Sequence, residues 1–160
     1  MNKIEVFFEE EKNDSESNAV KNDILSDLGI ELNGLKIIQC YYIEADLTQE
    51  ELEKIASKLF SDPIVQKYRI NSKAEIESDW LAEIKLLPGT TDNTGNAAMI
   101  GVKDLLKRDS FENESIKTSK KYYFFGGTEE EIKKICKKLL ANEIIESFEI
   151  KKLRWKNKKI

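Results

Sequence analysis

Apolar and polar residues follow strand-like and helix-like patterns in alternation along the first half of the chain. Ile4, Val6 and Phe8 lie on one side of a period-two pattern, which predicts a strand. A later run of apolar residues at helical spacing stops at Gly29, and glycine commonly ends helices. The predicted elements are a strand over 4–8, a helix over 19–28 behind N-cap candidates at 14–17, a strand over 35–45, a helix capped at 48–51 with its apolar stripe over 52–60, and a strand over 64–70. Residues 1–70 therefore predict the order β-α-β-α-β.

The second half of the chain predicts the same order of elements. They are a strand over 82–86, a loop over 88–96, a helix over 97–106, a strand over 116–125, a helix capped at 128–131 with its apolar stripe over 132–140, and a strand over 144–150. In the first of these strands Ala82, Ile84 and Leu86 face one side, because successive residues of a strand point to opposite faces. Gly126 and Gly127 break the long strand before the second helix.

Direct sequence similarity also joins the two halves. Residues 48–55 return as residues 128–135, and each copy begins with the Thr-x-x-Glu pattern of a helix capping box. An internal copy of this size indicates a duplicated module, and two copies in one chain can pack as the subunits of a homodimer do. One copy alone would leave one face of its sheet in water. We therefore expect an α+β fold in which two tandem β-α-β-α-β copies form an intramolecular dimer about a pseudo-two-fold axis.

The chain is expected to have four segments. They are a first copy at 1–70, a linker at 71–80, a second copy at 81–150 and a basic C-terminal tail at 151–160. The linker is polar and has no strong period. The tail holds six basic residues, which suit either a solvated end or the start of a connection into a longer chain.

Composition narrows the possible chemistry. Charged residues make up 35% of the chain and hydrophobic residues 40%, and the net charge of −4 argues against a general nucleic-acid binder. The chain has no histidine, which removes Ser-His-Asp and Cys-His catalysis and most zinc sites. Cys40 and Cys136 form no disulfide framework, and Cys136, which aligns with Ala56, is predicted to be a small buried residue. No apolar run reaches the roughly 20 residues that span a bilayer, so a cytoplasmic protein without membrane contact is expected.

Three features could carry function or could serve packing alone. The loop 88–96 is rich in turn-forming residues and either caps the next helix or contacts a partner or its substrate. The tyrosine pairs at 41–42 and 122–123 lie within strands, so one member of each pair is expected in the core and the other could face a partner. The glutamate runs at 9–11 and 129–131 are read as solvated, the second one favoured by the helix dipole.

Two segments of the second copy resemble the PurS family. Residues 139–150 are similar to the end of that family's sequence, and residues 87–97, with their Pro-Gly, Asp and Gly, are similar to its strand-to-helix loop. PurS is the small subunit of formylglycinamide ribonucleotide amidotransferase, also called phosphoribosylformylglycinamidine synthase. In large single-chain versions of that enzyme the N-terminal domain looks like two PurS subunits in tandem. Residues 3–150 resemble this tandem form more than they resemble the single subunit. The corresponding loop of the first copy, 9–15, lacks the Pro-Gly pair.

The resemblance implies a non-catalytic assembly role in the fourth step of de novo purine biosynthesis. The full enzyme uses ATP, Mg²⁺ and glutamine, and the resemblance implies that this chain binds none of them but bridges a synthetase (PurL-type) and a glutaminase (PurQ-type). The residues then expected near the partner or its substrate are Pro88, Gly89, Thr90, Asp92, Asn93, Gly95 and Asn96. No catalytic residue and no metal ligand is predicted. A small-metabolite-binding regulatory module and an enzyme based on lysine or carboxylates remain as alternatives.

Overall fold

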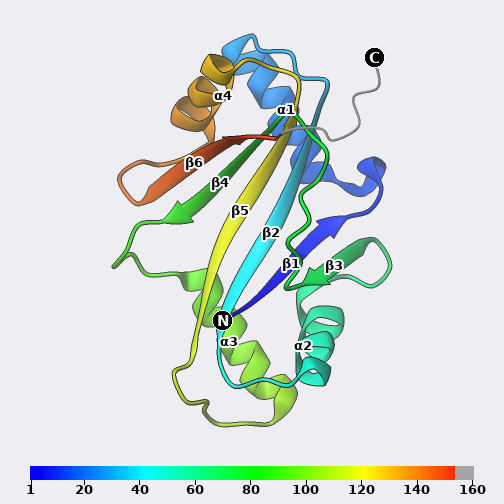
Figure 1. Cartoon of the computed structure of the whole chain (residues 1–160), viewed down its shortest axis with the longest axis vertical. Coiled ribbons are helices and arrows are strands. Elements are labelled where there is room, and N and C mark those ends of the chain that lie inside the picture. The colour runs from blue at the N-terminus through cyan, green and yellow to red at the C-terminus, as the bar shows by residue number, and fades with distance from the viewer. Residues whose placement is uncertain (154–160) are drawn as a thin grey trace. The chain divides into compact units, whose positions relative to one another are not determined.

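A computed structural model describes residues 1–153 and contains the β-α-β-α-β order twice (Figure 1). The first copy consists of β1 (Asn2–Phe8), a short 3-10 turn (Glu11–Asn13), α1 (Ser15–Leu28), β2 (Gly34–Glu44), α2 (Gln49–Ile55), its π-helical continuation η2 (Ala56–Phe60) and β3 (Gln66–Ile70). The second copy consists of β4 (Trp80–Leu86), α3 (Asn93–Leu106), β5 (Ser115–Phe125), α4 (Glu129–Ile135), its π-helical continuation η3 (Cys136–Leu140) and β6 (Glu146–Lys152). The predicted element types and their order are confirmed.

Local signals at the helix ends are confirmed as well. The Thr48 hydroxyl accepts a hydrogen bond from the Glu51 amide at 3.1 Å, and the Glu51 carboxylate accepts one from the Thr48 amide at 3.0 Å. Thr128 and Glu131 repeat this arrangement at 3.2 and 3.0 Å, so both capping boxes are present. Gly29 ends α1 in the left-handed region with φ of 67°, a conformation that costs glycine little.

Several predicted boundaries differ from the structure; the helix expected from residue 19, for example, starts at Ser15. The helix expected to start at residue 97 starts at Asn93, because Asp92 already caps it. The strands expected from residues 64 and 144 start at Gln66 and Glu146, because each is preceded by a hydrogen-bonded turn. The basic tail was expected from residue 151, but β6 continues to Lys152; residues 154–160 of that predicted tail lie outside the described residues.

The strands are hydrogen-bonded in the order β3-β1-β2-β5-β4-β6. The pairs β1–β2, β1–β3 and β4–β6 are antiparallel, with Ile4 opposite both Tyr41 and Ile70, and Ala82 opposite Ile150. The order reads the same from either end when each strand is exchanged for its counterpart in the other copy. This is the strand order that a pseudo-two-fold intramolecular dimer requires, and the α+β class is confirmed.

The chain folds into two compact units, and each unit contains parts of both copies. Unit 1 comprises Met1–Asn13, Ile38–Lys73 and Gly89–Ser119. Unit 2 comprises Asp14–Ile37, Ala74–Pro88 and the described residues from Lys120 onward. Helices α2 and α3 belong to unit 1, whereas α1 and α4 belong to unit 2. Each unit therefore takes one α-helix from each copy, and the sequence duplication and the compact packing divide the chain differently.

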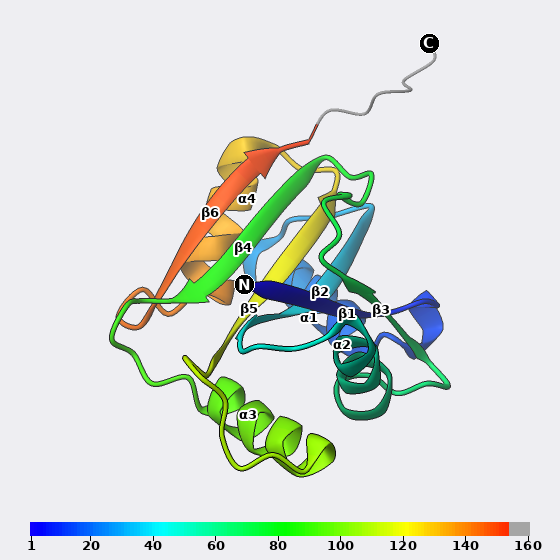
Figure 2. The same ribbon diagram turned by 60° about the horizontal axis from the view of Figure 1, so that its bottom comes forward.

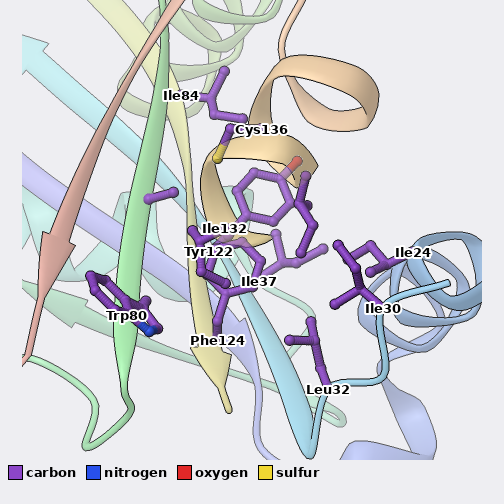
Figure 3. Close-up of a cluster of buried hydrophobic side chains, with 12 residues drawn as sticks. Ile24, Ile30, Leu32, Ile37, Trp80, Ile84, Tyr122, Phe124, Ile132 and Cys136 are labelled. Carbon is purple, nitrogen blue, oxygen red and sulfur yellow. The ribbon is translucent and has the colours of Figure 1, made fainter. Parts of the chain in front are cut away.

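Each unit has its own hydrophobic core. The buried core of unit 1 consists of Ile4, Val6, Ile43, Leu52, Ile55, Ala56, Met99, Val102, Phe111 and Ile116. The buried core of unit 2 consists of Ile24, Ile30, Leu32, Ile37, Trp80, Ala82, Ile84, Tyr122, Phe124, Ile132, Ile135 and Cys136, most of them labelled in Figure 3. In unit 2, α4 covers one face of the neighbouring strands β4 and β6 (Figure 2). Within the described residues, no helix is long and apolar enough to cross a membrane.

Candidate functional site

The candidate site is the loop between β4 and α3, which contains the residues predicted to lie near a partner. Pro88 and Gly89 are exposed, and Thr90 is half-buried. Gly89 has φ of 85°, in the left-handed region that disfavours a side chain, although a Cβ there would meet nothing within 4 Å. Glycine at this position is therefore explained by backbone conformation.

Asp92 ties this loop to both α3 and β5. Its carboxylate accepts hydrogen bonds from the Gly95 amide at 2.7 Å and from the Thr118 amide at 2.6 Å. The Thr118 hydroxyl adds contacts of 3.0 and 3.1 Å to the two carboxylate oxygens. Asp92 thus satisfies a helix N–H that has no intrahelical partner and a strand N–H at the same time.

Gly95 allows α3 to approach β5 more closely than any side chain would permit. A Cβ at this position would lie 1.9 Å from the Ile116 carbonyl oxygen. Contacts under 3.0 Å do not occur for real Cβ atoms, so the helix or the strand would have to move. Of the predicted site residues, Asp92 and Gly95 therefore have a full structural explanation.

The first copy performs the same capping with different residues. Asp14, the counterpart of Asp92, accepts hydrogen bonds from the Ser17 amide at 3.1 Å and the Ser17 hydroxyl at 2.7 Å. That hydroxyl in turn accepts from the Ile37 amide at 3.1 Å. In the first copy the Ser17 hydroxyl therefore bridges the aspartate and the strand. In the second copy the corresponding residue is Gly95, and Asp92 bonds the strand amide directly. The Asp is kept in both copies although the Pro-Gly pair occurs in one.

The outward side of this site is uncharged. Asn93 and Asn96 are exposed in the first turn of α3, and Ile100, one turn further, is 71% exposed. Ile100 lies within the helix predicted over 97–106, without a distinguishing signal of its own. Its exposure could not be read from the sequence, because it depends on which face of α3 the rest of unit 1 covers. The exposed residues named here in the first turns of α3 are therefore uncharged.

The tyrosine pair of β5 differs from the prediction. Tyr122 lies in the core of unit 2 as expected, but Tyr123 is also fully buried, so it offers no partner surface. Its hydroxyl donates to Glu75 at 2.5 Å, and Glu75 belongs to the linker between the copies. Burial raises the pKa of the Tyr122 hydroxyl well above its usual value, and nearby carboxylates add to the rise. The Tyr122 hydroxyl is therefore not an acid or base near neutral pH.

The two cysteines are buried and form no disulfide. Burial raises the pKa of the Cys136 thiol to about 12, so the thiolate that a nucleophile needs is not formed at neutral pH. The predicted burial of Cys136 as a small core residue is confirmed. Among the described residues, no group of three or more His, Cys, Asp or Glu side chains is arranged to hold a metal ion.

A buried charge cluster in unit 1 was missed by the sequence analysis. Glu5 is fully buried, yet it points away from the apolar residues that flank it on β1. Arg69 on β3 lies 3.2 Å from its carboxylate and Lys3 lies 3.7 Å away, while the Cys40 thiol donates at 3.8 Å. An alternating strand pattern predicts a solvated position here, because the pattern cannot show that neighbouring strands supply countercharges.

Comparison with known families assigns the fold. The model of the family PurS, described as phosphoribosylformylglycinamidine (FGAM) synthase, matches residues 2–74 and again residues 82–154. This chain belongs to the PurS family. The two matches cover nearly the whole chain and coincide with the two β-α-β-α-β copies, so the chain is a tandem PurS-like protein. No curated protein matches it.

Membership of the PurS family links the chain to FGAM synthase and thereby to purine biosynthesis.

Proposed function

We propose that this chain is a non-catalytic assembly module of FGAM synthase that bridges a PurL-type synthetase and a PurQ-type glutaminase. The observation that carries the proposal is the double match to the PurS family over residues 2–74 and 82–154. An assembly role is also in keeping with the chemistry of the described residues. The thiol of Cys136 is buried with a pKa of about 12, and histidine is absent from the sequence.

Within this proposal, the loop after β4 contacts the partner or lies near its substrate. The residues proposed for this contact are Pro88, Gly89, Thr90, Asn93 and Asn96, with Asp92 and Gly95 holding the loop in shape. ATP, Mg²⁺ and glutamine are then bound by the synthetase and glutaminase. We also propose a cytoplasmic location, in keeping with two cysteines that form no disulfide.

The test is reconstitution with the synthetase and glutaminase proteins. Light scattering of the full chain with both proteins is expected to give a complex larger than any pair. Glutamine-dependent formation of FGAM is expected to require this chain, whereas the chain alone is expected to have no activity. Normal glutamine-dependent turnover without this chain would contradict the assembly role, as would failure to find any complex.

A matched pair of variants tests the loop surface. Asn93→Arg with Ala97→Arg places two charges on exposed positions of α3, and it is expected to weaken complex formation at least tenfold. The control is Ser15→Arg with Ala19→Arg, at the corresponding exposed positions of α1 in the first copy. Equal loss of binding in both variants would contradict a specific role for the loop after β4.

A further inference from the structure

Helix α4 and its continuation η3 divide sharply into an apolar and a basic face. Ile132, Ile135 and Cys136 are fully buried in the core of unit 2. Four lysines are exposed on the other side: Lys133, Lys134, Lys137 and Lys138. Residues three and four apart are neighbours on a helix, so these four ammonium groups form one continuous patch.

Most of this positive charge has no ion-pair partner among residues 1–153. Lys133 lies 3.6 Å from Glu129, with both side chains more than half exposed. Such an exposed pair contributes little because water and salt screen it. For Lys134, Lys137 and Lys138 the part of the chain that the structure describes contains no ion pair. The patch is thus available to an external anion.

The equivalent face of the first copy serves as an internal comparison. Positions 133, 134, 137 and 138 correspond, eighty residues earlier, to Glu53, Lys54, Ser57 and Lys58. The formal charge is four positives (+4) in the second copy, against two positives and one negative (+1) in the first. Glu53 also accepts a hydrogen bond from the Tyr68 hydroxyl at 2.8 Å. The same fold position is therefore strongly basic in only one copy.

An exposed apolar residue follows the basic helix. Ile144 is 85% exposed at the tip of the turn between η3 and β6. Its amide donates to the Asn142 side chain at 3.2 Å, and the Asn142 amide donates to the Glu146 carboxylate at 2.9 Å. Backbone bonds from Ile145 and Glu146 to the Asn142 carbonyl, at 3.0 and 2.7 Å, close the turn. The side chain is therefore presented by a fixed backbone and not by a loose loop.

We propose that the α4 surface, defined as Lys133, Lys134, Lys137, Lys138 and Ile144, docks an acidic amphipathic segment of another protein. The lysines supply charge complementarity to its carboxylates, and Ile144 supplies one apolar contact. The structure favours a protein segment over nucleic acid. Helical residues rise 1.5 Å each, so the basic patch is only about 8 Å long, too short to track a phosphate backbone.

Carboxylates on both sides of the patch add to this argument. Glu129, Glu130 and Glu131 precede the lysines, and Glu143 follows them. These groups would repel the next phosphates of an extended polyanion. A peptide with a local cluster of carboxylates fits between them. Exposed charge pairs are weakened by salt, so binding is expected to fall steeply as ionic strength rises.

The test uses the full chain and a synthetic peptide of Glu-Glu-Leu-Glu repeats, followed by NMR of the ¹⁵N-labelled protein. At low salt, saturable shifts are expected in α4, η3 and the turn at Ile144, and not in α2, η2 or at Ile64. The triple variant Lys134→Gln, Lys137→Gln, Lys138→Gln is expected to weaken binding at least tenfold. Its matched control, Lys54→Gln with Lys58→Gln, is expected to change binding less than twofold.

The apolar contact is tested separately. Ile144→Ser, or a peptide of Glu-Glu-Ser-Glu repeats, is expected to weaken binding several-fold, whereas Ile64→Ser at the corresponding turn leaves it unchanged. Absence of saturable binding at low salt would overturn the proposal. So would equal shifts in the two copies, or tighter binding of single-stranded RNA than of the peptide. The experiment contains no purine-pathway protein, so its outcome is independent of the reconstitution test.

Discussion

At the scale of single residues, glycine at position 95 is required by a contact and not by backbone conformation. Helix propensity alone would favour replacing this residue, since glycine costs about 1 kcal/mol against alanine inside a helix. The carbonyl of Ile116, which would lie 1.9 Å from an added Cβ, opposes that gain. The obstacle is a backbone atom and not the end of a flexible side chain, so it cannot easily move aside. The steric cost of a side chain at position 95 is therefore expected to exceed the gain in helix propensity.

We predict that Gly95→Ser lowers the free energy of unfolding by at least about 2 kcal/mol, since a side chain forced into a packed contact costs 1–3 kcal/mol or more. Serine is the residue that the first copy has at the corresponding position, Ser17. Denaturant unfolding measures the change. The exposed neighbour variant Asn96→Ser is the control and is expected to stay within about 0.5 kcal/mol. A neutral or stabilising Gly95→Ser would contradict the close approach.

A second prediction at this scale concerns alkaline stability. Burial raises the pKa of the Cys136 thiol from 9.0 to about 12. Between these values the unfolded chain has lost the thiol proton and the folded chain retains it. The free energy of unfolding therefore falls as pH rises through this range, by up to about 1.4 kcal/mol per pH unit for this one group. Well below pH 9 the thiol is protonated in both the folded and the unfolded chain, so it does not make the free energy of unfolding depend on pH.

The measurement is denaturant unfolding at a series of pH values from 7 to 11. Cys136→Ala is expected to be less stable than the parent at pH 7, because it leaves a small cavity. Its stability is nonetheless expected to fall less steeply above pH 9. Some alkaline slope should persist, because burial also raises the pKa of Tyr122. If the free energy of unfolding fell equally steeply with pH in the parent and in Cys136→Ala, the raised pKa of the Cys136 thiol would be contradicted.

At the scale of elements, the two capping boxes are matched in geometry but start helices of different charge. Thr48 and Thr128 each accept from the amide three residues on, at 3.1 and 3.2 Å. We predict that Thr48→Ala and Thr128→Ala each lower the free energy of unfolding by about 0.5–2 kcal/mol. Thr→Ser at either position retains the hydroxyl and is expected to cost much less. Denaturant unfolding of the four variants distinguishes capping from a general effect of substitution.

Elements are also the scale at which the sequence was most informative. The capping boxes and Gly29 could be predicted because each depends on residues three or four positions apart. The start of α3 was misjudged by four residues, since Asp92 was counted as one of several turn residues and not as the cap. A comparison with Asp14 would have identified it. The burial of Tyr123 under Glu75 could not be predicted, because it depends on where an irregular linker runs.

At the scale of the whole molecule, the two copies exchange helices between compact units. Ile24 on α1 of the first copy lies in the same core as Ile132 and Ile135 on α4 of the second copy. Hydrophobic periodicity showed that these faces are apolar but not which faces meet. The prediction of two tandem copies was right, and the assignment of helices to cores came only from the structure.

This exchange makes a prediction for local stability. Ile24→Ala removes a fully buried side chain and is expected to cost about 2–5 kcal/mol. Amide hydrogen exchange should then speed up more in α4, which shares that core, than in α2, which belongs to the same copy as Ile24. Val102→Ala on α3 is the reciprocal variant and should affect α2 more than α4. Loss of protection confined to the mutated copy would contradict the helix exchange.

The same exchange constrains how the gene can change after its duplication. Deleting either half would remove one α-helix from each hydrophobic core, so the remaining half could complete its cores only by pairing with a second copy of itself. Surface positions remain free to diverge, as the unequal lysine content of the two halves illustrates. Helix exchange within one chain thus removes the need for a second chain that a single half would have.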